Sequence, residues 1–212
     1  MLNNCSRIVP LFIYREDAKM ADNFRPMDRQ RQNRVKQYDP LVHAQTTIDS
    51  AHRMIHDGFF FNTSGKETGW TNGTTKEFLI SPPAGCYPHV QAMVLNFGRG
   101  DIDFEAYEGP TITDNGTALT VRNVNRNSDN TPDLDLYASP TTTDDGTMEF
   151  QLWVPPTSTG TGQSSNGIEG VGQGSEWILK PSTPWLVRLT NNSGATIDWS
   201  YEFSWYEIGY ED

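Results

Sequence analysis

The clearest pattern in this chain is a strict alternation of large apolar and polar side chains near its C-terminal end, over residues 197–205. Successive strand residues point to opposite faces, whereas helical neighbours recur every three to four positions, so the alternation predicts a strand. A second strand candidate, residues 185–189, precedes it, and an Asn-Asn-Ser-Gly turn at 191–194 joins the two. We therefore predict a hairpin at the centre of an all-β domain. Its predicted core residues are Ile197, Trp199, Tyr201, Phe203 and Trp205.

The rest of the body continues as short strand candidates separated by turn signals such as Asn72-Gly73 and Asp144-Asp145-Gly146. This spacing predicts a single antiparallel β-sandwich over residues 46–212, jelly-roll-like, without a long helix or an internal repeat. The Gly- and Ser-rich residues 155–175 are predicted to form a flexible surface loop, with a contact or binding loop as the alternative. The strand candidates are 53–61, 75–80, 89–97, 101–107, 117–124, 133–137, 147–153, 176–180, 185–190 and 196–208.

Charge is distributed unevenly along the 212 residues, whose formal net charge is −11. Residues 1–38 hold eight Lys and Arg against four Asp and Glu, and the remaining residues hold eight against twenty-three. An acidic body argues against nucleic-acid binding. We interpret residues 20–45 as a basic N-terminal arm that contacts a partner, with a solvated tail as the alternative. The candidate contact residues in this arm are Arg25, Arg29, Arg31, Arg34 and Lys36.

The cysteine count indicates the compartment in which the protein folds. Two cysteines, Cys5 and Cys86, make no disulfide framework and are expected to be free thiols in a reducing cytosol. No apolar run approaches the roughly 20 residues that a membrane helix needs, so we expect no membrane association. Residues 1–19 differ in sequence character from the rest of the chain. We therefore hypothesise that translation starts at Met20 and that residues 1–19 are translated upstream sequence.

Two histidines, His52 and His56, are the first candidate for chemistry, because a spacing of four can place two imidazoles side by side. A zinc protease would need Glu after the first histidine, but Arg53 stands there. The surrounding sequence looks extended, and residues four apart also share a face of a strand. We therefore predict surface or interface histidines that contact a partner, and we do not predict a metal.

Acidic residues are the second candidate. The turns at 129–135 and 144–146 offer oxygen ligands that could suit calcium, although Asp and Asn are also ordinary turn residues. Asp101, Asp103 and Glu105 share one face of a strand, which is more typical of a solvated surface than of a carboxylate pair. No nucleophile elbow, dinucleotide-binding motif or marked triad is present, so we predict no catalytic residue, no cofactor and no enzymatic activity.

Exposed aromatic rings can stack on sugars, so the six Trp, eight Tyr and ten Phe also raise a carbohydrate-binding hypothesis. Most of them alternate within strands and are better explained as core. Trp70, Tyr87 and Tyr210 are the aromatic residues expected to be exposed.

Four segments resemble a known group of virion proteins. The run 46–60 opens with a histidine-containing stretch that leads into a Gly- and Phe-containing strand. The segments 125–129 and 141–147, and the ending that starts at 176–180, continue the similarity over residues 46–208. These segments are similar to those of the capsid decoration, or cement, proteins of tailed bacteriophages.

This resemblance implies a jelly-roll-like sandwich that forms a homotrimer at three-fold positions of a capsid and binds the major capsid protein. It also implies a protein made in the host cytoplasm and located on the virion, without enzymatic activity. A receptor- or glycan-binding module of a phage fibre is the alternative, and a carbohydrate-active enzyme domain is a weaker one.

Overall fold

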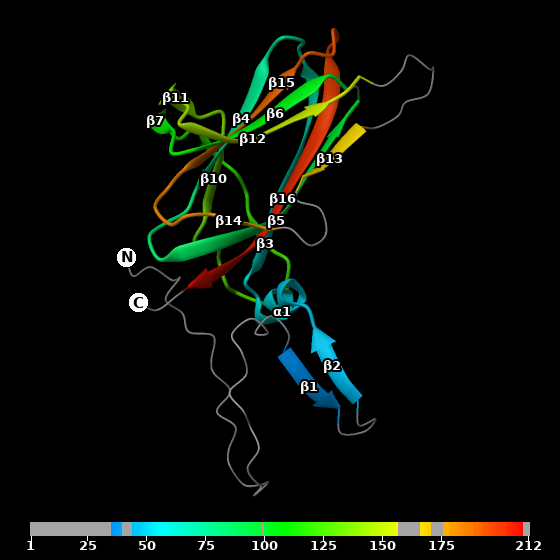
Figure 1. Cartoon of the computed structure of the whole chain (residues 1–212), viewed down its shortest axis with the longest axis vertical. Helices are drawn as coiled ribbons and strands as arrows, with labels where there is room; N and C mark the ends of the chain where they lie inside the picture. The colour runs from blue at the N-terminus through cyan, green and yellow to red at the C-terminus, as the bar shows by residue number, and fades with distance from the viewer. Residues whose placement is uncertain (1–34, 40–43, 99, 157–165, 171–175, 210–212) are drawn as a thin grey trace, which may run out of the picture.

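The chain folds into two antiparallel β-sheets that pack face to face, and these form the body in the upper part of Figure 1. This computed structural model describes residues 35–39, 44–98, 100–156, 166–170 and 176–209. The predicted all-β class and the antiparallel sandwich are confirmed. The first sheet, sheet I, contains, in spatial order, β12 (Thr147–Val154), β6 (Ile102–Glu108), β15 (Trp185–Asn191), β4 (Thr75–Ser81), β10 (Asp135–Ala138) and β8 (Thr117–Ala118).

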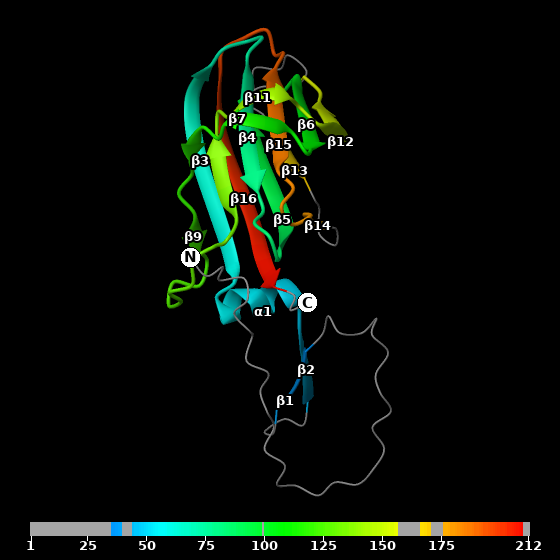
Figure 2. The same cartoon turned by 90° about the vertical axis from the view of Figure 1, so that its left-hand side faces the viewer.

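The second sheet, sheet II, lies behind sheet I when the molecule is turned as in Figure 2. One short helix, α1 (Ser50–Asp57), lies at one end of the sandwich, next to a two-stranded ribbon of β1 (Val35–Asp39) and β2 (Ala44–Ile48). Sheet II contains, in spatial order, β13 (Asn166–Gly170), β5 (Cys86–Phe97), β16 (Ile197–Gly209), β3 (Phe60–Trp70) and β9 (Arg122–Asn123), and β14 (Trp177–Ile178) also pairs with β5.

The predicted hairpin of the last two strands is wrong. β15 pairs with β4 and β6 in sheet I, whereas β16 pairs with β3 and β5 in sheet II. The turn after Asn191 therefore crosses from one sheet to the other. Asn191 is completely buried, and its side-chain amide donates to the carbonyl oxygens of Trp70 and Ala195, both at 3.0 Å. Each of the two strands is flanked on both sides, and their apolar faces meet across the core.

The core contains four of the five predicted residues: Ile197, Trp199, Phe203 and Trp205 are at most 4% exposed. The fifth, Tyr201, is half-buried and packs against the core. Aromatic rings join the sheets, since Phe78 of β4 lies 5.0 Å from Phe203 and 4.8 Å from Tyr201, measured between ring centroids. Burying each such ring stabilises the fold by about 1.5–3 kcal/mol relative to leaving it in water.

Other predictions for the body also need correction. The strand predicted over 53–61 is a helix followed by β3, and β3 runs through the Gly- and Thr-containing residues up to Trp70. The predicted loop 155–175 contains β13, which pairs with β5. Residues 157–165 and 171–175 of that loop lie outside the described residues. Trp70, expected to be exposed, is 1% exposed and packs against Trp199 with 5.3 Å between ring centroids.

The chain also contains an internal repeat, contrary to the sequence-based expectation. Residues 107–117 and 137–147 share the pattern Tyr-x-x-Pro-Thr-x-Thr-Asp-x-Gly-Thr. Their central parts, β7 (Thr111–Asp114) and β11 (Thr141–Asp144), pair with each other. Each of these two strands ends with an Asp that accepts a hydrogen bond from the backbone N–H of the Gly two residues later, at 2.9 Å for Asp114 and 2.8 Å for Asp144. Both glycines have positive φ, which only glycine adopts readily.

The repeat makes sheet I nearly symmetric about an axis between β4 and β15, where Leu79 faces Leu186. Equivalent backbone bonds confirm the relation, since Gly109 donates to the carbonyl of Pro184 and Ser139 to that of Glu77, both at 2.9 Å. The β7–β11 pair lies outside sheet I (Figures 1 and 2). The symmetry ends at the two sheet edges, because β12 has eight residues and β8 has two.

Candidate partner interface

Helix α1 carries both predicted histidines, so the expectation of an extended segment is wrong. Asp49 caps its start, accepting a hydrogen bond from the backbone N–H of Ala51 at 2.8 Å. Gly58 ends the helix with φ +78°, and its N–H donates to Ile55 at 3.1 Å. Phe59 then donates to Met54 at 2.9 Å, completing a Schellman motif. These caps were the sequence signals that could have identified the helix.

His52 and His56 are both exposed and lie one helical turn apart. Their Nε2 atoms are 2.9 Å apart, and the ring centroids are separated by 4.8 Å. Between them, Arg53 forms an ion pair with Asp57 at 3.1 Å. The structure therefore brings the two predicted histidines together on a solvent-facing side of the helix.

Three asparagines of the 123–130 segment fix the end of α1 to the sandwich. The side-chain amide of Asn125 donates to the carbonyl of His56 at 3.0 Å, and that of Asn123 donates to Gly58 at 2.8 Å. Asn130 donates to Gly58 at 3.2 Å. A side chain on Gly58 would meet Ser128, since its Cβ would lie 2.2 Å from the Ser128 hydroxyl oxygen. Two segments far apart in the sequence, 46–60 and 125–129, thus meet at this end of the sandwich.

The predicted arm residues cannot be placed relative to this helix. Arg25, Arg29, Arg31 and Arg34 lie outside the described residues, and Lys36 is described only as part of the backbone of β1. Tyr210 is also outside the described part of the chain, and Tyr87 is half-buried.

The open edge of sheet I carries the apolar surface that the sequence did not predict. β12 pairs with β6 on one side and contains a single charged residue, Glu149. Its side chains Trp153, Met148 and Leu152 are 55%, 47% and 38% exposed. Native sheets usually protect an exposed edge with charges or bulges, and large exposed apolar residues mark interaction sites. We call Met148, Leu152 and Trp153 the β12 patch: the register with β6 places Met148 and Trp153 on the face of Tyr107 and Asp103, and Leu152 on the opposite face with Phe104, so the three side chains line the strand edge.

Neighbouring residues pack against β12 and orient Trp153. Phe150 of β12 packs on Trp177 of β14 with 5.2 Å between ring centroids, so β14 lies beside the edge, and its Ile178 is 56% exposed. The indole N–H of Trp153 donates to Asp101 at 3.0 Å. This bond holds the exposed ring in one orientation, which lowers the entropy cost of burying it against a partner.

The acidic residues next to Trp153 are half-buried and form hydrogen bonds within the protein. Asp103 accepts from Asn192 at 2.7 Å, and Glu105 accepts from the hydroxyl of Tyr107 at 2.9 Å. In the turn at 144–146, for which calcium was only an alternative, the carboxylate of Asp145 accepts hydrogen bonds from the guanidinium of Arg188 at 2.6 and 2.7 Å. Over the residues that the structure describes, no group of three or more His, Cys, Asp or Glu side chains could hold a metal ion.

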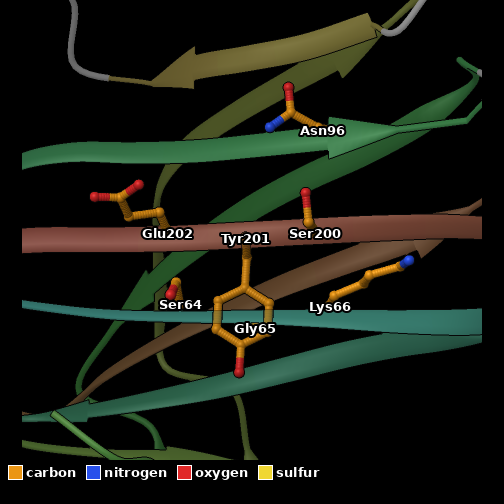
Figure 3. A pocket seen from close by; sticks show the side chains of 7 residues that line it. All are labelled: Ser64, Gly65, Lys66, Asn96, Ser200, Tyr201 and Glu202. Atoms are coloured by element: carbon orange, nitrogen blue, oxygen red, sulfur yellow. The ribbon is translucent and has the colours of Figure 1, made fainter.

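A hollow of about 430 Å³ lies on the outer face of sheet II (Figure 3). Polar side chains line it, among them Lys66, Asn96 and Glu202. The ring of Tyr201 lies across Gly65 from the inner side, where a Cβ on Gly65 would be 2.5 Å from the phenol. The other residues of the lining are Ser64 and Ser200.

Comparisons with protein-family models, curated proteins and solved structures find no match for this chain. None of the described helices is long and apolar enough to cross a membrane. Among the described residues, the β12 patch is the most distinctive external feature.

Proposed function

We propose that this chain is a non-enzymatic structural protein of a bacteriophage virion, which decorates and stabilises the capsid shell as a homotrimer. The resemblance of residues 46–208 to capsid decoration proteins motivates the proposal. The structural observation that supports it best is the β12 patch, because such a surface needs a protein partner. Within the described residues, the aromatic side chains otherwise lie mainly inside the sandwich.

In this proposal the β12 patch joins copies of the chain, and the basic arm contacts the major capsid protein. The patch combines a strand edge that pairs with none of the described strands with three large side chains, of which Trp153 is already oriented by Asp101. Buried aromatic anchors of this kind dominate protein interfaces. The arm, with Arg25, Arg29, Arg31, Arg34 and Lys36, complements an acidic shell surface electrostatically.

The test measures two properties of the purified chain: its mass in solution by sedimentation velocity and its binding to capsids that lack decoration. We expect a trimer that binds in hundreds of copies per particle. Replacing Trp153 and Met148 by Ser should give a folded monomer, because both side chains are exposed. Deleting residues 20–38 should leave the trimer intact and weaken capsid binding.

Three results would overturn this proposal. A wild-type chain that is monomeric at micromolar concentration excludes the trimer. A Trp153→Ser and Met148→Ser variant that remains trimeric shows that the β12 patch is not the contact. Undiminished capsid binding after deletion of 20–38 excludes the arm. The exposed position 178 supplies a control, since Ile178→Ser removes a similar apolar side chain outside the strand edge.

A glycan-binding module of a phage fibre is the second candidate, and the surroundings of Trp153 favour it. This ring is exposed beside Asp101, Asp103 and Gln151, and sugar sites combine an aromatic plane with polar hydrogen-bonding groups. A glycan array with wild type and Trp153→Ala would test it. Binding that the substitution abolishes would favour the fibre module, and no binding to any glycan would exclude it.

A further inference from the structure

The two histidines of α1 present two ring nitrogens to one point on the surface. The Nε2 atoms of His52 and His56 are 2.9 Å apart, and both side chains are exposed. In neutral imidazole one nitrogen donates and the other accepts, so the free protein can hold this contact as a hydrogen bond. The same separation also suits two ligands of one ion, because two nitrogens about 2.0–2.1 Å from an ion are this far apart at an angle of roughly 90°.

The backbone that carries these rings is fixed at both ends of the helix. The side chain of Asp49 caps the first turn, and the Schellman motif at Gly58 closes the last. The carbonyl of His56 itself accepts a hydrogen bond from Asn125 at 3.0 Å. An ion would therefore need to order only the two imidazole side chains, and no backbone would have to fold around it.

We propose that His52 and His56 form a bidentate surface site for a divalent transition-metal ion such as Cu²⁺, Ni²⁺ or Zn²⁺. Imidazole nitrogen suits these ions, and their general affinity order predicts that Cu²⁺ binds most tightly. Since no third protein ligand of the His, Cys, Asp or Glu type joins the pair within the described residues, the remaining positions are open to water or to a ligand from a neighbouring molecule. This site does not depend on the proposed virion function.

The nearest charges on α1 leave the site accessible to a cation. Arg53 follows His52 directly, but its guanidinium is paired with Asp57 at 3.1 Å, which offsets its charge locally. Replacing Arg53 therefore gives a useful variant, because it changes the helix surface and leaves both imidazoles in place.

The experiment is isothermal titration of the untagged full chain with NiCl₂ and CuSO₄ at pH 7.5. Wild type should bind one ion at this site with a micromolar dissociation constant, and His52→Ala and His56→Ala should each weaken binding at least 10-fold. Arg53→Ala should bind like wild type or more tightly. The double variant Arg53→His and His56→Ala keeps the number of histidines but places them in adjacent positions, and it should bind as weakly as the single alanine variants.

A second readout separates metal binding from a change in folding. Because the ion binds the folded helix, saturating Ni²⁺ should raise the thermal midpoint of wild type and leave those of the two alanine variants unchanged. Far-UV circular dichroism without metal should be the same for all variants. The proposal is overturned if either alanine variant keeps the wild-type affinity, or if the variant with adjacent histidines binds as tightly as wild type.

Discussion

Asp145 and Arg188 form a two-point ion pair between the turn after β11 and the centre of sheet I, with N–O distances of 2.6 and 2.7 Å. Arg188 also binds Glu77 of β4 at 2.6 Å, and its guanidinium lies over the ring of Tyr107 at 5.3 Å. The pair therefore attaches one copy of the internal repeat to sheet I. The hydrogen bonds from Arg188 hold the pKa of Asp145 below its usual range.

The first prediction concerns the pH dependence of this pair. A depressed carboxyl pKa stabilises the fold above the unfolded pKa of about 3.9, and this contribution is lost as pH falls through the folded pKa. Asp145→Asn should lower the free energy of unfolding at pH 7 by about 1–2 kcal/mol, a modest value because solvent screens the partly exposed carboxylate. At pH below 3 the difference from wild type should shrink.

Urea denaturation of both proteins between pH 2.5 and 7 measures this effect. Asp144→Asn is the matched control, since an Asn oxygen can still accept the Gly146 N–H and the side chain is exposed. An Asp145→Asn variant that is as stable as wild type at pH 7 would show that the ion pair does not stabilise the repeat.

The second prediction concerns Gly65, which Tyr201 covers. Gly65→Ala places a methyl group 2.5 Å from the Tyr201 ring, so the ring must move out of the core. We expect a loss of about 1–3 kcal/mol in the free energy of unfolding, as for other overpacked sites. Gly98→Ala is the control, because its nearest non-neighbouring atom would be 3.4 Å away.

A double-mutant cycle identifies the cause of this loss. In a Tyr201→Ala background the methyl group added at position 65 has room, so Gly65→Ala should cost less there than in wild type. Equal costs in the two backgrounds would show that Tyr201 does not determine the need for glycine at this position.

The third prediction tests the two-fold relation within sheet I. Gly116 and Gly146 each pack against the other copy of the repeat, where an added Cβ would lie 2.3 Å from the carbonyl oxygen of Ala138 or Glu108. Gly116→Ala and Gly146→Ala should therefore destabilise the fold by similar amounts. Both should exceed the roughly 1–3 kcal/mol that an unfavourable backbone conformation costs alone.

Gly73→Ala isolates that backbone cost, since Gly73 has φ +75° but an added Cβ would have no other atom within 4 Å. Thermal and urea denaturation of the three variants provide the comparison. If Gly116→Ala and Gly146→Ala lower the free energy of unfolding no more than Gly73→Ala does, the close contact between the two copies does not explain the need for glycine at positions 116 and 146.

The fourth prediction concerns Glu207, a carboxylate that is 7% exposed. Burial raises its pKa, although hydrogen bonds from the backbone of Asp133 and Leu134 and from the indole of Trp205 favour the charged form. A raised folded pKa means that this group contributes most stability below its unfolded pKa of about 4.3, and less as pH rises through the folded value. The contribution of Glu207 to stability therefore changes with pH in the opposite direction to that of Asp145.

Glu207→Gln cannot titrate, so the decrease in stability between pH 4 and the folded pKa should be smaller in this variant than in wild type. Denaturation midpoints at half-unit pH steps measure it. Glu202→Gln, on the same strand but exposed, should keep the wild-type pH profile. If the stability of Glu207→Gln and of wild type changes with pH in parallel over this range, a raised pKa of Glu207 does not explain the pH dependence.

Local patterns in the sequence were sufficient to predict the fold class and much of the core. The alternation at 197–205 assigns residues to the two faces of a strand, and four of the five predicted core residues are buried. The spacing of His52 and His56 also identified a pair that the structure brings together. Both inferences hold because they depend on positions within one element, and strand and helix geometry fix these directly.

Tertiary structure decided what depends on neighbours distant in the sequence. Alternation cannot say which strand β15 pairs with, so the apparent hairpin is a connection between sheets. It also cannot distinguish Trp70, buried within sheet II, from Trp153, exposed on the edge strand β12. A strand at the centre of a sandwich is covered by the opposite sheet, whereas an edge strand is left partly open. The sequence by itself therefore determined the β-sandwich, and the order of strands decided which aromatic surface remains for a partner.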